Sequence, residues 1–173
     1  MAARITWTLC GFKVIAYDYA ASMNENEIQF DSHRFAIETS SFRYITNSCS
    51  GPGWDFSFSG PCMSDDGDES EYPYGIRLMT EAGPLPLEPK DDLTGLSIEL
   101  NSPYDEKSGE PYFDVNVLEA HDVPKLKLKF VERRGDEYLI EINATVAETI
   151  TGKLETLSLV AWAKREKDHA YPT

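Results

Sequence analysis

The chain has 173 residues, 41% of them hydrophobic and 12% aromatic, and a formal net charge of −14 at pH 7. This apolar content predicts a folded globular protein and excludes an intrinsically disordered one. No apolar run approaches the ~20 residues that a membrane-spanning helix needs, so no membrane partner is expected. The length predicts a single domain, residues 1–173, with an acidic, loop-rich middle section at 47–111.

The acidic residues are concentrated in the middle of the chain. Residues 47–119 contain sixteen acidic and three basic residues, whereas residues 120–173 contain nine of each. This excess argues against nucleic acid as a partner, because phosphate backbones are bound by clustered lysine and arginine. It favours attraction to a basic protein.

The amino-terminal and cysteine patterns give an expected compartment and no cofactor. The first ten residues contain one charged residue and no continuous apolar core, so they do not predict a signal peptide, and the cytoplasm is expected. Cys10, Cys49 and Cys62 form no CxxC pair, and His33, His121 and His169 are isolated in sequence, so no metal site is predicted. Whether Cys49 and Cys62 pair stays open.

Alternating apolar and polar residues predict β-strands from the amino terminus onward. Residues 5–16 are expected to form one long strand with a bulge at Gly11. Residues 28–30 and 35–37 are expected to form two strands around a tight turn. Further strands are expected at 42–44, 54–58, 96–100 and 113–117, whereas three prolines between 84 and 89 predict an extended segment. His121 and Asp122 precede Pro124 and are predicted to lie in a surface turn.

Residues 125–146 carry the strongest pattern, an antiparallel β-hairpin. Leu126, Leu128 and Phe130 alternate with lysines, and residues 138–146 continue the period of two. A three-residue loop at 133–135, with Gly135 at a positive φ, sets the predicted register. In this register the predicted pairs are Phe130–Tyr138, Leu128–Ile140, Leu126–Ile142 and Lys127–Glu141.

Residues 153–167 fit either a third strand of this meander or a short carboxy-terminal helix, and the strand is favoured by the Leu-Ser-Leu-Val-Ala-Trp pattern. The predicted fold class is all-β, an antiparallel two-sheet sandwich that is jelly-roll-like or irregular. Two layers are expected because about ten short strands need a second sheet to bury their apolar faces.

No catalytic motif is present, so the chain is expected not to be an enzyme. The acids between residues 64 and 71 do not have the spacing of an EF-hand loop and are interpreted as a solvated acidic loop. Aromatic residues beside these acids suit a binding surface, because tyrosine and tryptophan dominate protein–protein hot spots. The alternative for Trp54, with Phe56 and Phe58, is that all three are core residues. The candidate binding residues are Trp54, Asp65, Asp66, Asp68, Glu69, Glu71, Tyr72 and Tyr74.

The sequence therefore predicts a non-catalytic cytoplasmic binding module, with an immunity or inhibitor-type protein that binds a basic partner as the leading hypothesis. Two alternatives stay open. The first is a carbohydrate-binding sandwich, in which aromatic rings stack on sugars and carboxylates bind their hydroxyl groups. The second is a hydrolase that uses two carboxylates. The pattern does not determine the oligomeric state.

Overall fold

The computed structural model describes residues 6–9, 12–15, 25–31, 33–47, 51–62, 75–117, 119–148 and 150–170. Within these residues the protein is all-β and contains no helix, and hence none long and apolar enough to cross a membrane. The strands are β1 (Thr6–Leu9), β2 (Phe12–Ile15), β3 (Glu27–Phe30), β4 (His33–Ala36), β5 (Thr39–Asn47), β6 (Gly53–Cys62), β7 (Gly75–Gly83), β8 (Ser97–Leu100), β9 (Asp114–Val117), β10 (Glu119–Arg134), β11 (Glu137–Glu148), β12 (Leu154–Arg165) and β13 (His169–Ala170).

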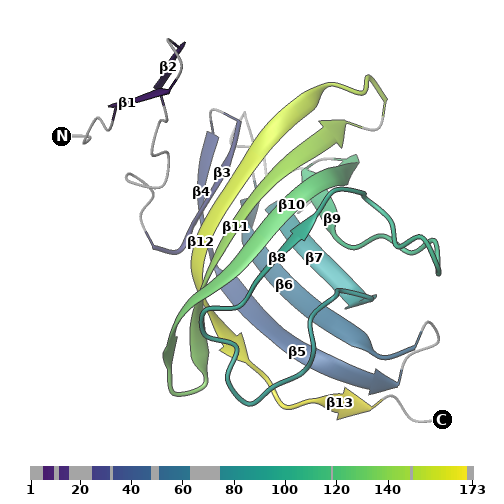
Figure 1. Ribbon diagram of the computed structural model, residues 1–173. Helices are drawn as coiled ribbons and strands as arrows, with labels where there is room; N and C mark the ends of the chain where they lie inside the picture. The colour runs from purple at the N-terminus through teal and green to yellow at the C-terminus, as the bar shows by residue number, and fades with distance from the viewer. Residues whose placement is uncertain are drawn as a thin grey trace.

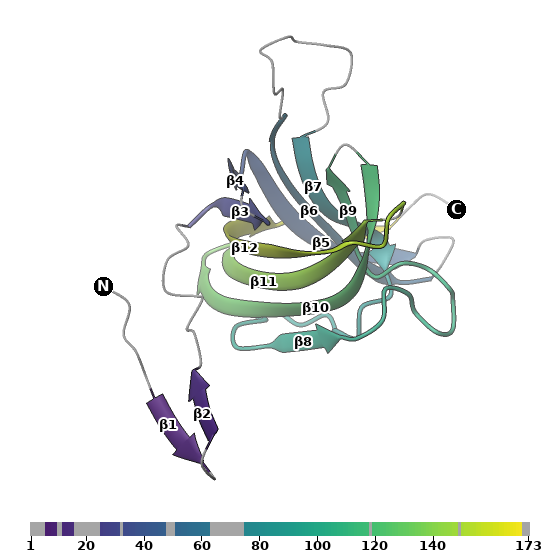
Figure 2. The ribbon, with the colours of Figure 1, turned by 90° about the horizontal axis from the view of Figure 1, so that it is seen from above.

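Seven strands close into a β-barrel (Figures 1 and 2). Neighbours in the order β5-β6-β7-β9-β10-β11-β12 pair antiparallel, and β12 then pairs with β5. The closing pair is parallel, with Lys164 opposite Ser41 and Arg165 opposite Phe42. An odd number of alternating strands leaves the first and last running in the same direction, so a parallel closing pair is required.

The remaining strands lie outside this ring. The β3–β4 hairpin extends from the edge of β12, β13 pairs with β5, and β8 pairs with the part of β10 that β9 does not reach. β1 and β2 form a separate two-stranded sheet. The long strand β10 thus has one edge shared by β9 and β8.

The prediction of a two-sheet sandwich is therefore wrong. Alternation along a strand shows that one face is buried, and it does so equally for a sandwich and for a barrel. The choice between them depends on whether β5 and β12 pair, and these strands are far apart in the sequence. The all-β class itself is confirmed.

Aromatic side chains fill the barrel interior. Phe42 on β5 stacks on Phe56 of the neighbouring β6, with ring centroids 5.3 Å apart. It also meets Phe130 on β10 and Tyr138 on β11, strands that do not pair with β5, at 5.6 and 5.5 Å. Phe56 in turn meets Phe113 at 5.8 Å. The interior is thus occupied by the protein's own side chains, as small barrels are.

The β10–β11 hairpin is confirmed, but its predicted loop and register are wrong. The loop has two residues, Gly135 and Asp136, and Gly135 has a φ of 66°. With a bulge between Phe130 and Glu132, Phe130 lies opposite Ile140 and Leu128 opposite Ile142. The error is two residues, and because side chains alternate with a period of two, the predicted inner and outer faces are unchanged.

Other local predictions have mixed outcomes. Residues 154–165 form a strand, which excludes the helix alternative there. The predicted long first strand is instead an antiparallel pair, β1 and β2. The prediction of a surface turn at His121 and Asp122 is wrong, because both residues belong to β10 and His121 is buried. Pro124 does not end the strand, because it lies at a shift of the β10–β11 register, where no regular backbone pairing is lost. A Cys49–Cys62 pair falls outside the described residues.

Candidate functional site

Of the eight predicted binding residues, Trp54 lies in the described part of the chain. Its side chain is 0% exposed, and Nε1 donates a hydrogen bond to the Leu87 carbonyl at 2.6 Å. Trp54 therefore belongs to the core, which was the alternative interpretation of its strand. The other seven lie outside the described residues, so their role stays a prediction: Asp65, Asp66, Asp68, Glu69, Glu71, Tyr72 and Tyr74.

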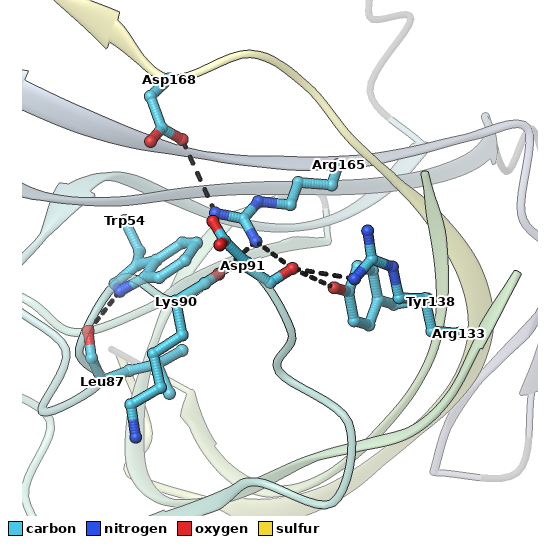
Figure 3. A network of polar contacts seen from close by, with 8 residues as sticks. All are labelled: Trp54, Leu87, Lys90, Asp91, Arg133, Tyr138, Arg165 and Asp168. Atoms are coloured by element: carbon cyan, nitrogen blue, oxygen red, sulfur yellow. Dashed lines mark hydrogen bonds and ion pairs between the residues drawn. The ribbon is translucent and has the colours of Figure 1, made fainter. Parts of the chain in front are cut away.

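A polar network fastens segment 84–96 across the barrel end at which β10 turns into β11 (Figure 3). Arg133 Nη1 and Tyr138 Oη donate to the Asp91 carbonyl at 3.0 and 3.1 Å. Arg165 Nη1 donates to the carbonyl of Lys90 and, at 3.3 Å, to that of Asp91. These donors tie the backbone of the segment to β10, β11 and β12, so the network is structural.

Two surface hollows have charges that nearly cancel. The hollow at this barrel end has a volume of about 500 Å³, and its lining includes three basic and four acidic residues. The second has a volume of about 480 Å³ and is centred on Arg43, which lies 2.8 Å from Asp55 and 3.5 Å from Glu166. Neither favours a ligand of particular charge.

The hollow beside the β8–β9 loop differs in its charge and in its aromatic residues. It has a volume of about 420 Å³ and lies between β8, Pro86 and residues 101–112. Its lining contains three acidic residues, one lysine and two tyrosines. The surrounding segment, residues 97–122, contains seven acidic residues and one lysine, a formal charge of −6. The residues that line this hollow are Pro86, Glu99, Leu100, Asn101, Ser102, Tyr104, Asp105, Glu106, Lys107 and Tyr112.

Backbone hydrogen bonds give the loop a fixed shape. Tyr104 forms a β-bridge with Pro111, and Tyr112 N–H donates to the Pro103 carbonyl at 2.9 Å. Gly109, at a φ of 73°, donates to the Asp105 carbonyl at 2.8 Å and ends the turn. The loop is therefore a small hairpin of its own.

Asp105 organises the turn through its carboxylate. Oδ2 accepts hydrogen bonds from Ser108 N–H at 2.8 Å, from Ser108 Oγ at 2.9 Å and from Lys107 N–H at 3.1 Å. These donors, Ser108 above all, hold the pKa of Asp105 below its ordinary value of 3.8. Asp105 is accordingly a charged group over the whole neutral range.

Tyr104 is the exposed aromatic residue of the site. Its side chain is 42% exposed, yet its hydroxyl donates to Asp122 Oδ1 on β10 at 2.7 Å. This hydrogen bond is the main reason that the pKa of Tyr104 is raised above its ordinary value. An exposed ring is thus held in one orientation by the barrel, which lowers the entropy that a partner must overcome on binding.

Tyr112 anchors the other side of the loop. Burial raises the pKa of its phenol, and the charge of Asp105, to which its hydroxyl donates at 3.3 Å, adds to this effect. The backbone at Tyr112 lies close to β7, where a Cβ on Gly83 would stand 3.0 Å from the Tyr112 carbonyl. Gly83 therefore permits the close approach that fixes the loop on the barrel.

The site was missed by sequence reasoning, although part of its signal is present. The Asp-x-x-Ser-Gly pattern at 105–109 is typical of a turn held by an aspartate side chain. The hydrogen bond from Tyr104 to Asp122 joins residues from separate elements, and no local pattern indicates it. The general prediction of tyrosines beside acids named positions 72 and 74, about thirty residues earlier.

Comparisons with known proteins add no identification, because no family model, no curated protein and no solved structure matches the chain. In the described part of the chain, no three histidine, cysteine, aspartate or glutamate side chains are grouped so as to hold a metal ion. The chemistry of the site must therefore be read from the β8–β9 loop itself.

Proposed function

We propose that the protein is a non-catalytic module that binds a basic polypeptide through the β8–β9 loop, as an immunity or inhibitor-type protein would. The observation that supports this most is Tyr104, an exposed ring held by Asp122 among the carboxylates of a formal −6 segment. Tyrosine is enriched in hot spots because it offers a large rigid contact with few rotamers to immobilise.

Charge complementarity supplies the selectivity in this proposal. Carboxylates around an aromatic anchor attract lysine and arginine, accelerate encounter and disfavour acidic partners. The odd number of cysteines is compatible with a reducing compartment, so we place the protein and its partner in the cytoplasm.

A hydrolase is the weaker alternative. Two described carboxyl groups have clearly shifted pKa values, Asp92 and Asp105, and both shifts are downward because N–H and O–H donors bind the ionised form. A general acid at neutral pH requires the opposite shift.

Binding of a synthetic decapeptide in which lysine alternates with valine tests the proposal. Fluorescence anisotropy would compare the native protein with Tyr104→Ala and with a Glu106→Gln, Glu110→Gln double variant. The matched control is Glu88→Gln with Glu137→Gln, which removes two negative charges elsewhere. We expect each loop variant to weaken binding at least tenfold, about 1.4 kcal/mol, and the control to change it less than about threefold.

The dependence of binding on ionic strength and the affinity for an oligosaccharide distinguish a basic-peptide site from a carbohydrate site. Raising the ionic strength from about 0.05 M to about 0.3 M should weaken peptide binding, because exposed charges are screened. A salt-independent affinity for a neutral oligosaccharide, with no binding of the peptide, would contradict the proposal and favour stacking of sugar on Tyr104.

A further inference from the structure

Beside the acidic loop, β8 has an edge without a strand partner. Its only pairing in the described part of the chain is with β10, through the pairs Leu126–Leu100, Lys127–Glu99, Leu128–Ile98 and Lys129–Ser97. Figure 2 shows β8 as the outermost strand on this side. An unpaired strand edge is a template for a further strand.

The hydrogen-bond pattern shows which backbone groups face this edge. Phe130 N–H donates to the Leu96 carbonyl at 2.9 Å, so Phe130 and, by alternation, Leu128 and Leu126 direct their backbone groups to β8. Their partners Ile98 and Leu100 face β10 in return. Ser97 and Glu99 therefore direct N–H and C=O away from β10.

The hollow of about 420 Å³ lies at the carboxy-terminal end of β8. Glu99, Leu100 and Asn101 line it on the strand side, and Pro86 and Tyr104 line it elsewhere. The side chain of Glu99 is exposed and lies 3.7 Å from Lys125 Nζ, in a solvent-exposed ion pair of the weak kind that a partner's lysine can replace. The side chain of Leu100 is buried. The unpaired edge of β8 thus leads to a hollow that is also lined by the exposed Tyr104.

We propose that the basic partner binds as an extended segment that adds a strand to β8, and this inference rests on the proposed function. Four residues of extended chain span about 13 Å, the length of β8. Alternate residues of the segment face outward toward Glu99, Asp105 and Glu106 and carry the lysine or arginine. The residues between them face Leu100 and Pro86 and are small and apolar.

The charge on this edge favours a basic segment over a second copy of the chain as the occupant. Two copies joined through β8 would bring Glu99 and its acidic neighbours against each other, in a protein of formal charge −14. Like charges opposite one another destabilise a strand pair. The same carboxylates stabilise a basic strand.

Backbone methylation of the peptide tests strand addition without altering the protein. An analogue of the lysine–valine decapeptide, N-methylated at alternate residues, keeps its charge but cannot donate to the Ser97 and Glu99 carbonyls. Methylation in either of the two alternate sets is measured, because the set that faces β8 depends on register. We expect one set to weaken binding at least tenfold.

A protein variant and amide exchange complete the test. Glu99→Pro removes the outward N–H and leaves the β10 ladder intact, whereas Glu99→Gln removes the same charge and keeps the N–H; circular dichroism checks the fold of both. The proline variant should bind at least fivefold more weakly than the glutamine variant. In the native protein, hydrogen exchange at the Ser97 and Glu99 amides should slow when peptide is added.

The results of these experiments distinguish strand addition, binding at the acidic loop alone, and dimer formation. Equal binding of both methylated sets, with no protection at Glu99, overturns strand addition while the acidic-loop proposal stands. No peptide binding at all removes both. A dimer that protects the same amides without peptide assigns the edge to a second copy and also overturns the inference.

Discussion

At the scale of single residues, the candidate site depends on carboxylates that accept several hydrogen bonds at once. Asp105 accepts them from Lys107, Ser108 and Tyr112, and Asp122 fixes Tyr104. The residue types were readable in the sequence as turn formers and acids. Which acid meets which tyrosine depended on the packing of β10 against the loop, so the pairing was not predictable.

The pKa of Asp105 gives a pH-dependent prediction. Because this pKa is lowered in the folded loop, its contribution to loop order is present above 3.8 and is lost as the pH falls through the lower folded value. A carbon-detected NMR titration should place the Asp105 carboxyl below 3.8. Ser108→Ala, which keeps the backbone donor and removes Oγ, should move it part of the way back; no movement would show that Ser108 Oγ does not stabilise the carboxylate.

At the scale of elements, alternation predicted strands well and their register poorly. The β10–β11 hairpin has its predicted inner and outer faces, but a bulge and a two-residue loop shift the pairs by two residues. An extra residue at a bulge inverts the alternation beyond it. The bulge between Phe130 and Glu132 is not visible in the pattern because residues 132–134, which separate it from the loop, are all exposed.

The two faces of β10 should respond differently to truncation. Leu128 is fully buried and Lys127 is exposed, with its side chain on the outer wall. Leu128→Ala should lower the free energy of unfolding by about 2–5 kcal/mol, and Lys127→Ala by well under about 1 kcal/mol. Equilibrium urea unfolding measures both. Equal losses would mean that the outer face is also covered.

Segment 84–96 gives a second element-scale prediction. Arg165→Met removes the donors to the Lys90 and Asp91 carbonyls but keeps the aliphatic stem, and should lower the unfolding free energy by about 1–3 kcal/mol. The control is Lys164→Met, whose exposed side chain lies 3.9 Å from Asp136 and should matter by less than about 1 kcal/mol. Indistinguishable variants would show that the segment is held by its buried leucines alone.

At the scale of the whole molecule, closure of the barrel was outside the reach of the sequence. Strands β5 and β12 meet through two residue pairs, and the Ser40 hydroxyl donates to the Trp162 carbonyl across this seam at 2.6 Å. Nothing in the alternation of either strand indicates the other. Because aromatic side chains fill the barrel interior, we expect any binding surface on the outside of the barrel.

Phe42 packs against side chains from three other strands of the barrel. Its side chain packs against Phe56 of the neighbouring strand β6 and against Phe130 and Tyr138 of β10 and β11. Phe42→Ala should therefore lower the unfolding free energy by about 3–5 kcal/mol, whereas Ser41→Ala, on the outer wall of the same strand, should change it by less than about 1 kcal/mol. Thermal and urea unfolding of both variants check this. A small loss at Phe42 would contradict a single aromatic core.

The central claim is that a basic polypeptide binds at the β8–β9 loop, and NMR mapping tests it most directly. Backbone amide shifts of the labelled protein would be followed while the lysine–valine decapeptide is added. The predicted result is that perturbations concentrate in residues 97–113 and at Asp122, and that they vanish in the Tyr104→Ala variant. Perturbations confined to the lysine-bearing outer face at 125–129, or to the barrel end around Arg133 and Arg165, would contradict it.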